Sequence, residues 1–154
     1  SLATNISQHD IEAMVIGGHG DTTMIPLTSV SKCNNKFLSE IVSDDVIKNI
    51  SAETMIGGAT LTRLLGTSAW YAPGASVSYL VNAIINDTKE ILPCSVYLEG
   101  EYNSSDLCIG VPVIIGVNGF EEVVHLDINK KEMEMFENSV KAVKQTNLAL
   151  NGLI

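Results

Sequence analysis

The dipeptide Asn118-Gly119 lies between two apolar runs, residues 107–117 and 121–126, and it limits the folds open to this chain more than any other feature. Asn-Gly between strand-like runs is the strongest short-range signal for a two-residue hairpin. A hairpin joins antiparallel neighbours, whereas parallel strands need a long crossover. The second half of the chain is therefore predicted to contain antiparallel strands, with residues 92–98 as a further strand.

The run 107–117 contains Gly110 and Pro112. Proline cannot donate a hydrogen bond to a sheet, and glycine inside a strand often marks a bulge. We therefore expect either a bulge or an edge position for this strand.

Three segments have helical spacing. In the first, Ser43 is the expected N-cap, followed by Asp44 and Asp45 where the helix dipole favours anions, and the spacing continues to Leu65. Gly57-Gly58 interrupts it. Each glycine costs roughly 1 kcal/mol of helix stability relative to alanine, so we expect a neighbouring helix, a ligand or a partner subunit to come close there.

The other two helices are predicted around residues 77–85 and from about Lys130. Apolar residues recur at helical spacing in both, namely Val77, Leu80, Val81, Ile84 and Ile85 in one, and Met133, Phe136, Val140 and Val143 in the other. Asn129 and Glu132 have the spacing of a capping box.

Near the start, residues 11–16 are a short strand candidate that runs into the glycine-dense loop 17–21, and the chain is irregular to about Ser31. Hairpin-joined strands with segregated helices indicate an α+β fold. We expect one domain over residues 1–154, with an antiparallel or mixed sheet and helices packed on one side. The sequence contains no glycine-rich dinucleotide fingerprint, so no Rossmann domain is predicted in this chain.

Composition excludes several classes of function. A net charge of −9 disfavours binding to nucleic acid. The longest apolar runs, such as 111–117, are too short to cross a bilayer, and no secretory signal opens the chain. Three cysteines without a C-x-x-C pair are interpreted as reduced, buried thiols, so a cytoplasmic location is expected.

His19 is the main candidate for chemistry. Gly18 and Gly20 flank it directly after an apolar strand, which leaves the imidazole unobstructed and lets a substrate approach the backbone. A loop histidine without function remains the alternative. Surface and structural roles are expected for His9 and His125. No metal site is predicted, since no ligand set forms around His19 and Asp21.

Several motifs in order carry a resemblance to a known family. Val15-Ile16-Gly17-Gly18-His19-Gly20-Asp21-Thr22 resembles the active-site histidine motif of the lactate/malate dehydrogenase family of 2-hydroxy acid dehydrogenases. Further matches are the segments 24–27, 68–76, 92–95, 97–102 and 110–116, followed by Asn118-Gly119 and the final helix. The resemblance covers nearly the whole chain. Gly17 is more typical of the malate dehydrogenases, because many lactate dehydrogenases have Glu there.

Two segments depart from the family pattern. Residues 52–56 replace an arginine-rich stretch, and residues 28–30 stand where an arginine is often found. These departures affect expected surface or interface contacts and leave the His19 loop intact.

The resemblance implies the C-terminal, substrate-binding half of an NAD-dependent malate dehydrogenase, acting on malate and oxaloacetate. His19 would be the acid/base, Gly18 and Ala69 would line the substrate pocket, and Pro73 would lie beside the nicotinamide. By family pattern, the NAD-binding Rossmann domain, the aspartate that orients the histidine and two substrate-binding arginines precede Ser1. Consistent with this, Arg63 is the only arginine and is expected at the surface.

The resemblance also implies a homodimer or homotetramer, and it implies that this half is inactive alone. Two alternatives remain open: half of an L-lactate dehydrogenase or another 2-hydroxy acid dehydrogenase, and a non-enzymatic binding or structural module of the same fold.

Overall fold

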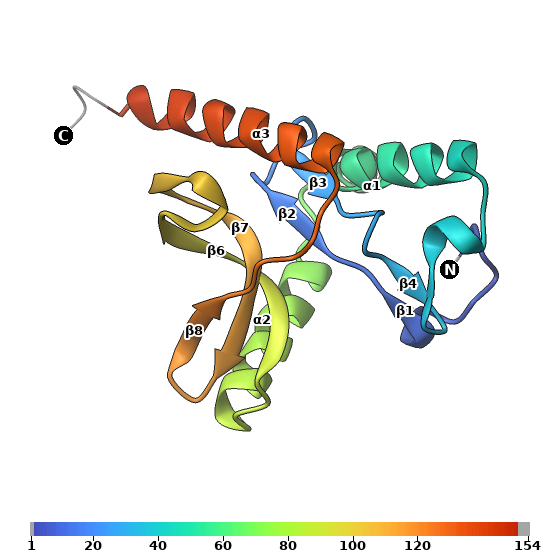
Figure 1. Cartoon of the computed structure of the whole chain (residues 1–154), viewed down its shortest axis with the longest axis horizontal. Coiled ribbons are helices and arrows are strands. Elements are labelled where there is room, and N and C mark those ends of the chain that lie inside the picture. Colours follow the sequence, from blue (N-terminus) through green and yellow to red (C-terminus); the bar gives the residue numbers. More distant parts are fainter. Residues whose placement is uncertain (1, 151–154) are drawn as a thin grey trace.

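The computed structural model describes residues 2–150 as helices packed on antiparallel sheets (Figure 1). The helices are α1 (Asp44–Leu65), α2 (Tyr71–Ile85) and α3 (Lys130–Leu148), with short 3-10 turns η1 (Gln8–Asp10), η2 (Leu38–Glu40) and η3 (Glu101–Asn103). The strands are β1 (Ile11–Glu12), β2 (Val15–Gly17), β3 (Met24–Pro26), β4 (Lys32–Cys33), β5 (Lys36–Phe37), β6 (Glu90–Glu99), β7 (Ser105–Gly116) and β8 (Gly119–Val123). The predicted α+β class is confirmed.

The main sheet has the order β3-β2-β7-β6, and β8 pairs with β7. Every pairing is antiparallel. The predicted hairpin is confirmed: Gly116 pairs with Gly119, whose φ of +84° is a conformation that suits glycine. Strand β8 ends at Val123, earlier than the predicted end at residue 126.

The expected edge position for β7 is wrong, whereas the alternative, a bulge, is observed but not at Gly110 or Pro112. The strand lies inside the sheet, and its register shifts instead at Leu98/Glu99 and at Ile114/Ile115. On the side of β7 opposite β6, Gly110 pairs with β2, and pairing with β8 starts at Val113. Pro112 therefore lies between these two partner strands. The ladder needs no N–H donor at that point, which explains why proline is tolerated there.

The first predicted strand is divided in two. β1 pairs with β4 in a small separate sheet, whereas β2 belongs to the main sheet. Strand β3 was not predicted. It is three residues long, contains Pro26 and lies at an edge, so neither alternation nor composition distinguishes it from a loop.

The core lies between the main sheet and the helices α2 and α3. Alternate residues of β7 point into it: Leu107, Ile109, Val111, Val113 and Ile115 are buried. Phe136 of α3 and Ala83 of α2 complete this cluster. The predicted capping box is confirmed, since the Asn129 side chain accepts from the Glu132 N–H and the Glu132 carboxylate accepts from the Asn129 N–H.

Helix α1 begins after Ser43 as predicted, although the Ser43 side chain makes no capping hydrogen bond. It runs unbroken through Gly57 and Gly58. A methyl group placed on either glycine would meet no other atom within 4 Å among the described residues. The close approach predicted there is therefore not made by a helix of residues 2–150.

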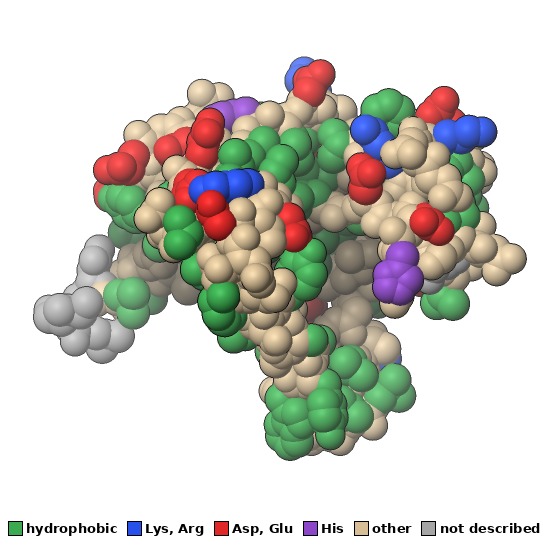
Figure 2. All heavy atoms as spheres, turned by 90° about the horizontal axis from the view of Figure 1, so that it is seen from below, with side chains coloured by type: hydrophobic (Ala, Val, Ile, Leu, Met, Phe, Trp, Pro, Cys, Tyr) green, Lys and Arg blue, Asp and Glu red, His purple; other side chains and the backbone are tan. Residues whose placement is uncertain are grey.

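Helix α2 has two apolar sides instead of one. Leu80, Ala83 and Ile84 pack on the core, while Val77 and Ile85 are 61% and 73% exposed. Exposed apolar residues continue through Trp70 and Tyr71 to the last turn of α1. Figure 2 shows hydrophobic side chains gathered on the projecting end of the molecule. No helix within residues 2–150 is long and apolar enough to cross a membrane.

Candidate active site

His19 lies in the hairpin loop that joins β2 to β3. Gly17 and Met24 form the last strand pair, and the loop is closed by hydrogen bonds from Gly18 N–H to Thr23 C=O (3.1 Å) and from Thr23 N–H to Gly20 C=O (2.9 Å). The His19 side chain is exposed. The loop therefore presents an accessible imidazole from a backbone with fixed ends, as the flanking glycines predicted.

The base of this loop has no room for side chains. Gly17 has a φ of +93°, and a Cβ there would lie 2.3 Å from the carbonyl oxygen of Thr23. Across the sheet, a Cβ on Gly110 would lie 2.8 Å from the Gly17 carbonyl oxygen. The Gly17–Gly110 pair lets β2 lie close to β7, and this fixes where the His19 loop leaves the sheet.

A third element holds the loop from behind. The Ser139 side chain of α3 is 3% exposed, and its hydroxyl accepts from Gly18 N–H (2.9 Å) and donates to Thr23 C=O (2.8 Å). The sequence analysis did not identify Ser139. Its position in the sequence could have indicated it: Ser139 lies between Phe136 and Val140 on the apolar side of the helix, and a polar group buried there requires hydrogen-bond partners.

His19 and Gly18 line a pocket of about 350 Å³ together with residues of β2, β3, β6 and β7. The β6 and β7 residues are Pro93, Cys94, Ser95, Cys108, Ile109 and Gly110. Burial raises the pKa of the Cys94 thiol, so this wall of the pocket carries a neutral group near neutral pH. The pocket combines apolar walls with one exposed imidazole, which can accept or return a proton.

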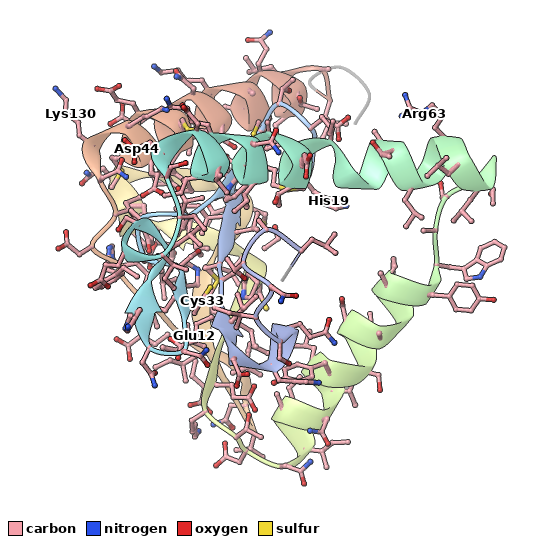
Figure 3. All side chains as sticks on the ribbon, turned by 90° about the vertical axis from the view of Figure 1, so that its right-hand side faces the viewer. Glu12, His19, Cys33, Asp44, Arg63 and Lys130 are labelled. Carbon is pink, nitrogen blue, oxygen red and sulfur yellow. The ribbon has the colours of Figure 1, made fainter. Side chains whose placement is uncertain are left out.

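Ala69 and Pro73 are not among the residues lining this pocket. Ala69 is partly exposed in the bend between α1 and α2, and Pro73 is exposed in the first turn of α2, where proline is tolerated. Figure 3 places His19 and Arg63 on opposite sides of α1, with Arg63 pointing outward. Residues 2–150 thus join His19 with Gly18 but not with Ala69, Pro73 or the only arginine.

Among residues 2–150, the other histidines and the cysteines belong to no metal-binding cluster. Within the described part of the chain, no three His, Cys, Asp or Glu residues are grouped to hold a metal ion. His9 lies exposed in η1. His125 lies beyond the end of β8, in contrast to the predicted strand position, and stacks on Tyr102 with ring centroids 4.7 Å apart. The cysteines are free. Cys33 is buried, Cys94 is half-buried and Cys108 is exposed, so the prediction of buried thiols is right for Cys33 and wrong for Cys108.

Comparison with known proteins gives a consistent result. Residues 1–149 match the family described as lactate/malate dehydrogenase, alpha/beta C-terminal domain. The chain is 56% identical, over all of its length, to 50% of a malate dehydrogenase of Flavobacterium johnsoniae. It is 54% identical over 150 residues to a malate dehydrogenase of Bacteroides thetaiotaomicron, covering 97% of this chain and 48% of that protein.

Solved structures agree in fold. A malate dehydrogenase of Cryptosporidium parvum superposes with a TM-score of 0.93 at 38% identity, over 99% of this chain and 50% of that one. A lactate dehydrogenase of Eimeria maxima, solved with NADH and oxamate, gives a TM-score of 0.91 at 35% identity, over 98% and 49%. The chain thus spans about half the length of the relatives it matches, and it corresponds to their C-terminal half.

Proposed function

Because the chain belongs to the lactate/malate dehydrogenase family, we propose that it is the histidine-bearing C-terminal half of an NAD-dependent malate dehydrogenase. Its proposed reaction is the interconversion of malate and oxaloacetate. The observation that carries this proposal is the exposed His19 imidazole, which lines a pocket and is carried by a glycine hairpin that allows no side chains at its base. A retained loop of this kind is not expected of a structural module.

His19 acts as the acid/base in this proposal. Oxidation of malate removes the hydroxyl proton and a hydride from C2. Imidazole can take up the proton and return it in the reverse direction, since its ordinary pKa of roughly 6.5 lies near neutrality. NAD, when bound, accepts the hydride. The remaining task of this half is to fix the imidazole and to bound the substrate with small groups, for which Gly18 and Ala69 are the candidates.

The cofactor would be held mainly by an N-terminal Rossmann domain, which we propose as the covalent partner of this half. Two exposed residues at the start of α2 support a contact between this chain and the nicotinamide ring of the cofactor. Pro73 is exposed in the first turn of α2, and the neighbouring Trp70 is 64% exposed, so this end of the helix offers apolar surface to a planar ring. The carboxylates of the substrate require guanidinium groups, which we assign to the N-terminal domain because Arg63 points away from His19.

We further propose a homodimer or homotetramer and a cytoplasmic location. The exposed apolar residues of α1 and α2 support contacts with other chains or domains, since extended apolar surface usually marks an interface. The free thiols at Cys33, Cys94 and Cys108 are typical of a reducing compartment.

The test is His19→Asn in the full-length enzyme. Loss of a positioned general base should lower kcat by about 10²-fold or more. NAD affinity, measured separately, should stay the same because the dinucleotide is bound elsewhere. His9→Asn, which changes an exposed histidine in η1, is the matched control and should retain full activity.

A His19→Asn enzyme that keeps most of its kcat would remove His19 from the mechanism. Comparing kcat/KM for malate and for lactate in the wild-type enzyme tests the substrate, and a preference for lactate would overturn the malate assignment.

A further inference from the structure

We propose that Ser139 is a positioning residue for His19: its buried hydroxyl holds together the two ends of the loop that carries the imidazole. The proposal rests on the proposed function, because it matters for catalysis only if His19 is the acid/base. Gly18, directly before His19, donates to the hydroxyl, and Thr23, which closes the loop, accepts from it. One side chain therefore bridges both ends of the segment.

The Ser139 contacts are the long-range hydrogen bonds of this loop. The other hydrogen bonds of the loop in the described chain join residues 18–24 among themselves. Those local bonds close the turn, and the pairing of β2 with β3 and β7 fixes its ends in the sheet, but neither attaches the turn to a helix. Ser139 is 121 residues from Gly18 in sequence, so its bond ties the turn to α3 and through it to the core.

Helix α3 and the His19 loop are closely packed around the Ser139 hydroxyl. A Cβ on Gly17 would lie 3.0 Å from Ser139 Oγ, and a Cβ on Gly18 would lie 3.2 Å from Val143 Cγ2. Helix α3 thus lies directly against the backbone of the loop. A shift of α3 relative to the loop would break the Ser139 hydrogen bonds, so these bonds hold the segment that bears His19 at a fixed position against α3.

Local helix chemistry gives no other reason for a serine here. Alanine is the better helix former, and a serine inside a helix commonly bonds back to a carbonyl of the preceding turn. The Ser139 hydroxyl instead donates to Thr23. The Ser139 hydroxyl therefore stabilises the contact between α3 and the His19 loop.

The kinetic consequence follows from geometry. A catalytic group displaced by about 1 Å can lose roughly 10²-fold in rate. In Ser139→Ala, Gly18 N–H keeps its bond to Thr23, so the loop should remain formed but move more freely. We expect kcat of the full-length enzyme to fall about 10-fold to 100-fold, with KM for malate and NAD affinity within about twofold of wild type.

The control is Ser29→Ala. Ser29 also joins α3 to the rest of the chain, because its N–H and its hydroxyl donate to the Glu132 carboxylate, and neither bond involves the His19 loop. This variant weakens the attachment of α3 without touching the bridge. Its kcat should equal that of the wild type even where its thermal stability is lower.

Amide hydrogen exchange supplies a measurement that does not depend on activity. Exchange of the Gly18 N–H in the full-length protein should be at least about 10-fold faster in Ser139→Ala and unchanged in Ser29→Ala. Ser139→Cys, whose thiol is larger and forms weaker hydrogen bonds, should fall between Ser139→Ala and wild type in both exchange and kcat. It also serves where the alanine variant does not fold.

Equal losses of kcat in Ser29→Ala and Ser139→Ala would overturn the proposal, because they would show that any loosening of α3 suffices. Unchanged Gly18 exchange in Ser139→Ala would overturn it as well, as would faster exchange with an unchanged kcat. Failure of the proposed function is distinguishable: in that case His19→Asn retains activity, whatever the exchange of Gly18 shows.

Discussion

At the scale of single residues, the first prediction concerns Ala69, in the bend between α1 and α2. Ala69 is partly exposed there, and the family resemblance assigns it to the substrate pocket. We expect Ala69→Leu in the full-length enzyme to raise the KM for malate or to abolish turnover, because the larger side chain fills space that a dicarboxylate needs. NAD affinity should change little.

Steady-state kinetics and a separate NAD titration measure this pair of effects. Ala52→Leu adds the same bulk at an exposed position of α1 and should leave both constants unchanged. Equal weakening of malate and NAD binding by Ala69→Leu would show that Ala69 is wrongly placed.

Cys94 offers a pH-dependent prediction. Burial raises the pKa of its thiol above the ordinary value of roughly 8.5, and the thiolate is the reactive form. Alkylation of Cys94 by iodoacetamide should therefore be slower at pH 8 than that of a cysteine in an unfolded peptide, and it should keep rising at higher pH.

Mass spectrometry across pH 7 to 10 measures the alkylation rate, with the exposed Cys108 as an internal check on reagent access. The raised pKa also affects stability. The folded state binds the Cys94 thiol proton more tightly than the unfolded state does, so the free energy of unfolding falls as pH rises above the pKa of the unfolded chain. A Cys94 rate matching the peptide at every pH would contradict the shift.

Sequence analysis named His19 as a candidate site residue but did not name Ser139, for a physical reason. The flanking glycines are adjacent in sequence, so the accessibility of the imidazole could be predicted locally. The partners of Ser139 are more than 100 residues away, and only the packing of α3 against the β2–β3 hairpin brings them together. Ala69 and Pro73 do not line the pocket of His19 within residues 2–150, so their roles remain predictions.

At the scale of elements, the attachment of α3 depends on Glu132. Its buried carboxylate accepts from the backbone of Ser29, from the Ser29 hydroxyl and from the Asn129 N–H. We expect Glu132→Ala to lower the free energy of unfolding by about 1–3 kcal/mol, since it leaves a partly buried donor without an acceptor. Denaturant unfolding of the full-length protein measures the change.

Glu134→Ala is the matched control. This carboxylate lies on the same helix, its side chain is 61% exposed, and its ion pair with Lys130 is long at 3.9 Å. It should change stability by less than about 0.5 kcal/mol. If the two alanine variants are equally stable, Glu132 does not anchor the helix.

Prediction of elements succeeded where the signal was local. The N-cap positions of α1 and α3 and the Asn118-Gly119 hairpin are set by neighbouring residues, and the structure confirms them. It failed for β3 and for the place of β7 in the sheet, because an edge or a centre is defined by which strands pair and not by the strand itself.

At the scale of the whole molecule, the largest run of exposed apolar residues follows α1 and α2. Helix α1 has no buried residue, and Leu64 is 75% exposed near its end. The apolar pattern of α1 and α2 predicted helices correctly but could not say which side packs on this chain and which on another. Exposed apolar surface of this extent is typical of an interface with another chain or domain.

The last prediction concerns the chain of 154 residues by itself, which we expect to show neither saturable NAD binding nor malate-dependent reduction of NAD. Its sequence contains no glycine-rich phosphate-binding loop, its net charge of −9 repels a pyrophosphate, and its single arginine faces away from His19. Isothermal titration calorimetry with NAD, and absorbance at the NADH band with malate present, measure the two activities, with the full-length enzyme as the positive control. Saturable NAD binding by the chain alone would contradict the assignment of the cofactor site to an N-terminal domain, while leaving the role of His19 to be decided by its own variant.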